Sequence, residues 1–324
     1  MLEQKIFGIS NEDEFNATAL KVFNYQFQNN PVYNQFCKLL KREPSSVNSI
    51  MDIPFLPIEF FKSKKVVTGD HTAQVTFSSS GTTGSLTSKH YVSSLHLYEK
   101  SFIKAFQKFY GNPKEYVFLA LLPSYLERTG SSLIYMVDSL IKKSENKDSG
   151  FYLNNLNELS EKLTILDRGD KKVFLIGVSF ALLDLVEIKQ FSLQNTIVME
   201  TGGMKGRRRE MIREELHGIL KKGFGVTNIH SEYGMTELLS QAYSSGKGIF
   251  NCPPWMKILI RDPEEALSFF PSGKTGGINV IDLANLNSCS FIATQDLGRI
   301  KNDEVEILGR FDNSDIRGCN LLLL

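Results

Sequence analysis

Apolar runs alternate with amphipathic segments along the middle of the chain. Continuous apolar runs predict four buried strands, at residues 116–122, 173–178, 196–199 and 226–229. Apolar residues at helical spacing predict helices around them, at residues 93–110, 131–143, 179–189 and 207–222. This alternation predicts an α/β fold in which a mainly parallel sheet is covered by helices on both faces. Ligands bind at the carboxyl ends of such strands, so the loops at 201–206 and 231–237 are predicted to bind a ligand.

The two ends of the chain do not show this alternation of apolar runs and amphipathic segments. Acidic residues after Ser10 and Asn11 predict one helix, and Pro31 begins a second helix that runs to residue 40. Residues 52–61 contain two prolines among large apolar side chains, which predicts an extended, partly buried segment. From about Cys252, short strand-like pieces alternate with turns and predict a smaller β-rich subdomain. We expect a core over residues 1–250, the subdomain over 251–312 and a tail over 313–324.

A polar, glycine-containing stretch precedes the long helix at 93–110. Its hydroxyl and glycine residues are Ser78, Ser79, Ser80, Gly81, Thr82, Thr83 and Gly84. Glycine allows close backbone approach to a ligand, and hydroxyls and successive backbone N–H groups bind anionic oxygens. Lys89 adds a positive charge nearby. The stretch is not a Walker A loop, and it reads either as a polyphosphate-binding loop or as a solvated Ser/Gly linker.

Three further loops contain residues that are suited to binding a ligand or a metal ion. The loop after the third strand contains Gly202 and Gly203, which permit a flat ligand to approach the backbone. After the fourth strand, Tyr233 offers a ring for stacking, and Thr236 and Glu237 offer a hydroxyl and a carboxylate suited to Mg²⁺. Farther on, the segment Thr294-Gln-Asp-Leu-Gly-Arg is interpreted as a turn whose Asp296 could take two ribose hydroxyls.

Composition narrows the class of protein. The chain has 324 residues, 37 basic and 36 acidic, and this balance argues against a nucleic-acid-binding protein. Its four cysteines, Cys37, Cys252, Cys289 and Cys319, are widely spaced and predict neither a zinc site nor a disulfide framework. No signal peptide and no membrane-spanning run is recognisable. We therefore expect a cytoplasmic protein with reduced thiols.

Four motifs occur in a fixed order: Ser-Ser-Gly-Thr-Thr-Gly, Tyr-Gly-Met-Thr-Glu, Asp-Leu-Gly-Arg and Gly-Arg-x-Asp. Together they resemble the signature motifs of the adenylate-forming enzymes, which include acyl-CoA synthetases, firefly luciferase and peptide-synthetase adenylation domains. Within that superfamily the chain looks most like the LuxE-type acyl-protein synthetases. The narrower resemblance rests on residues 53–62, on His230-Ser-Glu-Tyr-Gly-Met-Thr-Glu and on the terminal Ile316-Arg-Gly-Cys-Asn.

The resemblance implies roles for individual residues. The loop from Ser78 to Gly84 would hold the β- and γ-phosphates of ATP. Gly202, Gly203 and Met204 would line the adenine and acyl-adenylate site, and His230 would belong to the acyl side. Tyr233 and Gly234 would lie at the adenine, Thr236 at the α-phosphate and Glu237 at Mg²⁺. Asp296 would hold the ribose hydroxyls with Arg310 nearby.

The chain departs from the superfamily pattern in two ways. Thr87 occupies the usual place of the phosphate-loop lysine, and the nearest lysine is Lys89, two residues later. The chain also ends where relatives hinge into a C-terminal domain, so we expect most or all of that domain to be absent. Its loss would remove the adenylating lysine, and Lys89, Lys205 or Arg310 would have to supply the cation. The resemblance makes Cys319 the acyl-accepting thiol, whereas the residues alone favour a tail cysteine packed with leucines.

We expect ATP-dependent activation of a fatty or other carboxylic acid, transfer to Cys319, and transfer from there to a partner reductase. One alternative acceptor is CoA or a carrier-protein thiol. A second alternative is a serine acyltransferase using Ser179, although an N-cap role for that serine is the simpler interpretation. A third is a nucleotide-binding scaffold without activity. The basic run 207–209 is interpreted as part of a solvated helix face.

Overall fold

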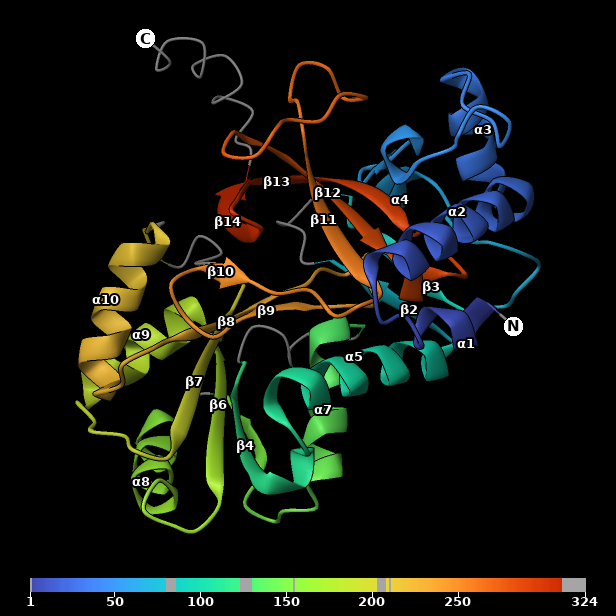
Figure 1. Ribbon diagram of the computed structural model, residues 1–324. Helices are drawn as coiled ribbons and strands as arrows, with labels where there is room; N and C mark the ends of the chain where they lie inside the picture. Colours follow the sequence, from blue (N-terminus) through green and yellow to red (C-terminus); the bar gives the residue numbers. More distant parts are fainter. Residues whose placement is uncertain are drawn as a thin grey trace, which may run out of the picture. The chain divides into compact units, whose positions relative to one another are not determined.

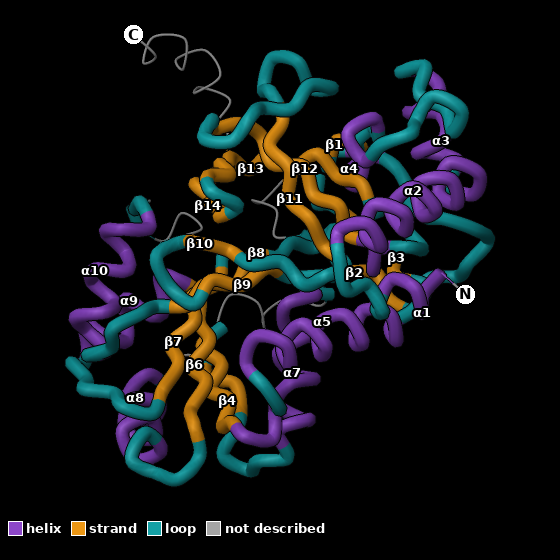
Figure 2. The backbone as a smooth tube through the Cα atoms, viewed as in Figure 1, coloured by secondary structure: helices purple, strands orange, loops and turns teal. Residues whose placement is uncertain are grey.

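The computed structural model describes residues 2–79, 86–122, 130–153, 155–202, 208–209 and 211–310, and it divides into two units. One unit contains the residues up to His71 together with those from Ile249 onward, and the other runs from Thr72 to Gly248. Each unit has its own β-sheet (Figures 1 and 2). None of the described helices is long and apolar enough to cross a membrane.

The unit from Thr72 to Gly248 is built on a six-stranded sheet of order β5-β4-β6-β7-β8-β9. Its strands are β4 (Tyr116–Leu121), β5 (Gly150–Tyr152), β6 (Lys172–Val178), β7 (Thr196–Thr201), β8 (His230–Tyr233) and β9 (Ala242–Ser244). All neighbours are parallel except β8 and β9. Every residue of β4 is buried, as expected for a parallel strand covered on both faces. The predicted mainly parallel sheet is confirmed.

Helices cover both faces of this sheet. They are α5 (Leu95–Tyr110), α7 (Ser132–Ser144), α8 (Leu156–Leu166), α9 (Ser179–Ile188) and α10 (Arg213–Phe224). Figure 1 shows α8, α9 and α10 on one side of the strands and α5 and α7 on the other. A short antiparallel ribbon, β2 (Val75–Ser78) with β3 (Lys89–Val92), completes the unit.

Two predicted boundaries in this unit are wrong. The strand placed at 226–229 is β8, which begins at His230, because Gly225 ends α10 with a φ of 68° and residues 226–229 connect the two. The helix placed at 207–222 is α10, which begins only at Arg213. Arg208 and Arg209, which precede it, therefore do not lie on a helix face.

The other unit has a six-stranded sheet of order β10-β14-β13-β12-β11, with β1 pairing parallel to β13. The strands are β1 (Leu56–Pro57), β10 (Ile249–Phe250), β11 (Met256–Arg261), β12 (Thr275–Asp282), β13 (Phe291–Lys301) and β14 (Glu304–Arg310). Strand β13 contains the segment interpreted above as a turn around Asp296, so that interpretation is wrong. The Asp-Leu-Gly sequence instead marks a register shift between Leu297 and Gly298, typical of a β-bulge.

The N-terminal helices belong to this second sheet. They are α1 (Leu2–Ile6), α2 (Glu12–Asn29), α3 (Pro31–Leu39) and α4 (Phe60–Ser63). The Asn11 side chain accepts a hydrogen bond from Glu14 N at the start of α2, where the acidic first turn also suits the helix dipole. This assignment differs from the expected core over 1–250, because the first 71 residues pack with the β-rich segment rather than with the parallel sheet.

One buried glutamine ties the two ends of this unit together. Gln26 on α2 is fully buried, and its Nε2 donates to the carbonyls of Asn285 and Leu286 at 3.0 and 2.9 Å. Nε2 also lies 3.1 Å from Ser290 Oγ, and Oε1 accepts from Ser290 N at 2.9 Å. Residues more than 250 positions apart are thus joined through one side chain, which explains why the unit is discontinuous in sequence.

Replacing Gln26 with methionine is expected to lower the free energy of unfolding by about 2–4 kcal/mol, because buried backbone groups lose their partners. Urea unfolding measures the loss. Gln28→Met is the matched control, since Gln28 is an exposed glutamine on the same helix. Equal, small losses for both variants would contradict the assigned role of Gln26.

Candidate functional site

The carboxyl ends of β7 and β8 lie side by side. Their parallel register pairs Met199 with His230 and Thr201 with Glu232. Alternate residues of a strand face opposite sides of the sheet, so His230 and Glu232 share one face with Thr201. Glu200 and Ser231, which are also partners, share the other face. Two groups of polar side chains, one on each face, therefore lie at this edge of the sheet.

On the face covered by α9 and α10, polar contacts hold the end of β7. Ser179 Oγ donates to the carbonyl of Gly202 at 2.9 Å and to Glu200 Oε2 at 3.3 Å. Glu200 Oε1 lies 3.6 Å from His217 Nε2 on α10. Gly202 has a φ of 65°, a conformation that glycine adopts without strain. The end of β7 is therefore held by side chains of both helices, and Gly202 by Ser179 of α9.

These contacts correct the interpretation of Ser179. The residue is the first of α9, whose N-cap is Val178, and no side chain caps the helix. The hydroxyl is buried, and the shorter of its two hydrogen bonds goes to the backbone carbonyl of Gly202, which cannot act as the base that a serine nucleophile needs. Its position therefore fits a structural residue and argues against the serine acyltransferase alternative.

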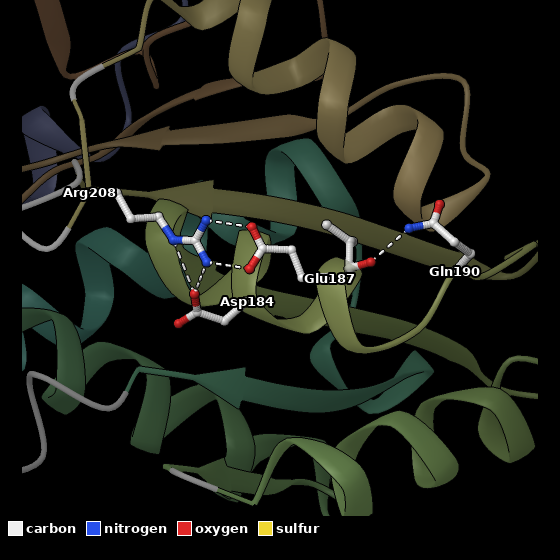
Figure 3. Close-up of polar contacts among 5 residues, drawn as sticks. Asp184, Glu187, Gln190 and Arg208 are labelled. Atoms are coloured by element: carbon white, nitrogen blue, oxygen red, sulfur yellow. Dashed lines mark hydrogen bonds and ion pairs between the residues drawn. The ribbon is translucent and has the colours of Figure 1, made fainter.

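An arginine follows the same loop. Arg208 Nε donates to Asp184 Oδ1 at 3.1 Å, and Nη1 and Nη2 donate to the two carboxyl oxygens of Glu187 at 2.6 Å each. Figure 3 shows the guanidinium between these two carboxylates of α9. Arg208 thus anchors the chain after this loop to α9. The same helix, through Ser179, holds Gly202 at the start of the loop. The expected solvated helix face at 207–209 is corrected for Arg208.

On the opposite face Glu232 has an unusual environment. Its Oε2 accepts from Thr201 Oγ1 at 2.5 Å. Burial, and secondarily the charge of Glu200, raise the pKa of Glu232 to about 7, although the Thr201 bond favours the anion. On the same face His230 Nδ1 lies 3.2 Å from the hydroxyl of Tyr110, and burial lowers the pKa of His230. At neutral pH the imidazole is uncharged.

The ribbon that flanks the serine- and glycine-rich loop reaches the segment after β8. Ser78 pairs with Lys89 across β2 and β3, and Ser79 and Ser88 exchange hydrogen bonds just beyond. The fully buried His90 donates from Nδ1 to the carbonyl of Thr236 at 2.8 Å. The strand that follows the first motif is therefore linked to Thr236 of the second motif. His90 was missed from the sequence because a lone histidine in a short strand carries no pattern.

The other residues predicted for this segment lie at the end of β8 or just after it. Tyr233 ends β8, Gly234 and Thr236 follow it half-buried, and the Glu237 side chain is buried. Magnesium commonly uses one or two protein carboxylates together with substrate phosphates, so a single buried carboxylate is compatible with a magnesium site. Ser80, Gly81, Thr82, Thr83, Gly84, Gly203, Met204 and Cys319 lie outside the described residues, as does Lys205.

In the other unit, two residues from separate motifs are cross-strand partners. Asp296 on β13 pairs with Arg310 on β14, and Arg310 Nε lies 3.4 Å from Asp296 Oδ1. Asp296 is buried, whereas 78% of the Arg310 side chain is exposed. The expected proximity of the two residues is observed, because they are direct partners across β13 and β14.

Solved structures with a similar fold are known. The fold is similar to that of ATP-bound MatB from Rhodopseudomonas palustris, with a TM-score of 0.56 and 19% identity over 75% of this chain. It is also similar to 2-hydroxyisobutyryl-CoA ligase in complex with 2-HIB-AMP and CoA, with a TM-score of 0.67 and 12% identity over 94%. The chain spans half the length of MatB and 72% of the ligase. The fold is that of the adenylate-forming enzymes.

Two sequence comparisons show which enzymes the chain resembles in sequence. Residues 2–108 match the family described as "Acyl-protein synthetase, LuxE". The chain is also 23% identical to the long-chain-fatty-acid–luciferin-component ligase of Vibrio harveyi, over 92% of this chain and 84% of that protein. The predicted resemblance to the adenylate-forming enzymes, and among them to the LuxE-type acyl-protein synthetases, is confirmed.

The raised pKa of Glu232 has a consequence for stability. Between its ordinary value of 4.5 and about 7 the folded protein binds more protons than the unfolded chain, so stability falls as pH rises through this window. Replacing Glu232 with glutamine removes that dependence. Relative to the wild type, the variant is expected to gain on the order of 2–3 kcal/mol of unfolding free energy between pH 4.5 and pH 8.

Urea unfolding at several pH values measures this gain. Glu214→Gln serves as the control, because Glu214 is exposed on α10. A difference between Glu232→Gln and wild type that stays constant across the pH range would contradict the assigned environment of Glu232.

Proposed function

We propose that the protein is an ATP-dependent acyl-protein synthetase that activates a fatty acid and transfers it to a cysteine. The observation that carries this proposal is the match to one kind of enzyme along the chain: the LuxE family over residues 2–108, and the luciferin-component ligase over 92% of the chain. The ligase's name specifies long-chain fatty acids, and we take the same substrate class as the starting point here.

In the first step a carboxylate oxygen attacks the α-phosphorus of ATP, the bond to the β-phosphate breaks, and pyrophosphate leaves. The protein mainly positions the reactants and stabilises charge. The loop from Ser78 to Gly84 holds the β- and γ-phosphates, and Thr236 contacts the α-phosphate. The hydrogen bond from His90 to Thr236 supports this pairing, because it links the strand after the loop to the Thr236 segment.

The roles at the nucleotide are those that the resemblance implies for individual residues. Tyr233 stacks on adenine beside Gly234, and Gly202, Gly203 and Met204 line the adenine and acyl-adenylate site. Asp296 accepts hydrogen bonds from the ribose hydroxyls. Glu237 holds Mg²⁺, which would neutralise phosphate charge when bound.

The developing negative charge also needs a protein cation. The exposed Arg310 side chain beside Asp296 and the exposed Lys89 beside the phosphate loop are the candidates among the described residues. His230 contributes to the acyl side, where its neutral imidazole does not attract a second anion.

In the second step a thiolate attacks the acyl carbon, AMP leaves and a thioester forms. Burial raises the pKa of Cys37 and Cys252 to about 12 each, and raises that of Cys289 as well. These three thiols are therefore poor nucleophiles at neutral pH. Cys319 remains as the acceptor, and the acyl group then passes to a partner reductase. CoA, which is present in the 2-hydroxyisobutyryl-CoA ligase structure, is the second candidate acceptor.

Intact-protein mass spectrometry after incubation with ATP, Mg²⁺ and long-chain fatty acids tests the acceptor. Wild type is expected to gain the mass of one acyl group, removable by hydroxylamine, and Cys319→Ser is expected to gain none while still releasing pyrophosphate. Cys252→Ser is the matched control and should be acylated like wild type. Pyrophosphate release without an adduct on wild type would refute Cys319 and favour CoA or a carrier thiol. ATP binding without release would indicate a scaffold.

A further inference from the structure

His90 connects the base of the serine- and glycine-rich loop with the segment after β8. It is fully buried on β3, and across the ribbon of β2 and β3 it pairs with Phe77, the residue that precedes Ser78. Its Nδ1 donates to the carbonyl of Thr236 at 2.8 Å. A carbonyl oxygen can only accept, so this ring nitrogen carries a proton. All four residues belong to the unit from Thr72 to Gly248.

The carbonyl that accepts from His90 lies between two candidate site residues. It is part of the peptide group that joins Thr236 to Glu237. The atoms of a peptide group lie close to one plane, which includes both flanking Cα atoms. A hydrogen bond that orients this plane therefore sets the backbone of both residues at once. In the function proposed above, these two residues contact the α-phosphate and hold Mg²⁺.

The segment that contains this peptide group has no regular structure of its own. Residues 234–241 form neither helix nor strand, and the pairing of Tyr233 with Ala242 joins the two ends of the segment. Near its end, Ser240 Oγ lies 2.9 Å from Ser101 Oγ on α5, and both serines are fully buried. Contacts with β3 and α5, which both follow the serine- and glycine-rich loop in the chain, thus hold the segment in place.

We propose that His90 is a positioning residue for adenylation. Through the Thr236 carbonyl it aligns the Thr236 hydroxyl and the Glu237 carboxylate with the phosphates held by the loop before β3, and it contacts neither ATP nor the acid itself. This inference rests on the proposed function and adds a residue to its machinery. A misplacement of about 1 Å can cost on the order of 100-fold in rate when a reaction depends on alignment.

A histidine that only stabilises the fold would behave differently. Loss of a buried donor lowers stability wherever it occurs, but it leaves the turnover of the folded protein unchanged. A positioning residue acts on groups that stabilise the transition state, so its loss lowers kcat more than it raises KM. Asparagine separates the two roles, because its amide nitrogen can take the place of Nδ1 and donate to the same carbonyl.

Acid-dependent exchange of pyrophosphate into ATP tests the inference. His90→Leu removes the donor and is expected to lower kcat by about 10- to 100-fold, with KM for ATP changed by less than about threefold. His90→Asn keeps a donor and should stay within about threefold of the wild-type kcat. His90→Met is the second variant without a donor, should His90→Leu fail to fold.

The control is Ser144→Ala. Ser144 ends α7, is 1% exposed and donates from Oγ to the carbonyl of Ile141 at 2.7 Å. This variant also loses a buried donor to a carbonyl, so Tm should fall while kcat is kept. The inference would be overturned, with the proposed function intact, if His90→Leu kept the wild-type kcat. Equal losses in His90→Asn and His90→Leu, or an equal loss in Ser144→Ala, would also overturn it.

No exchange with any acid would instead refute the proposed function. In that case the affinity for ATP with and without Mg²⁺, measured by isothermal titration calorimetry, decides the inference. A gain in affinity from Mg²⁺ that His90→Asn keeps and His90→Leu loses would support it. The same gain in both variants, no gain in the wild type, or no binding of ATP would overturn it.

Discussion

The register between β7 and β8 is the constraint on which the candidate site depends. It sets Thr201 beside Glu232 and Glu200 beside Ser231, and because side chains alternate, each pair lies on its own face of the sheet. A slip of one residue would exchange the faces and place Glu232 among the residues of α9 and α10. The polar set that fixes the end of β7 and the Thr201–Glu232 pair both result from this single alignment.

Helix α9 has a second structural task beyond covering the sheet. Its first residue, Ser179, holds the carbonyl of Gly202, and its carboxylates at Asp184 and Glu187 hold Arg208. The loop between Gly202 and Arg208 is therefore anchored at both ends to one rigid element. Positioning of this kind matters for a reaction in which alignment of phosphate, carboxylate and cation supplies most of the rate.

The sequence predicted the elements whose composition matches their environment. Strands β4 and β6 are buried on both faces and read as continuous apolar runs. Strand β8 does not, because His230, Ser231 and Glu232 are polar, and it is a strand only through its pairing with β7 and β9. Strand β13 was interpreted as a turn because Asp296 and Gly298 are turn residues, but pairing with strands on both sides overrides that preference.

The candidate site was predictable in a similar, partial way. Tyr233, Asp296 and Arg310 belong to short motifs, so the sequence singles them out, and their roles stay predictions. His90, Thr201 and Arg208 are brought to their partners by the fold across distances at which no local spacing applies.

Acid-dependent exchange of labelled pyrophosphate into ATP is the most direct measurement of the central claim, because it reports reversible acyl-adenylate formation irrespective of the final acceptor. The account predicts exchange that requires both Mg²⁺ and a carboxylic acid and that persists in Cys319→Ser. Absence of exchange with every acid, or ATP hydrolysis that does not depend on an acid, would contradict it.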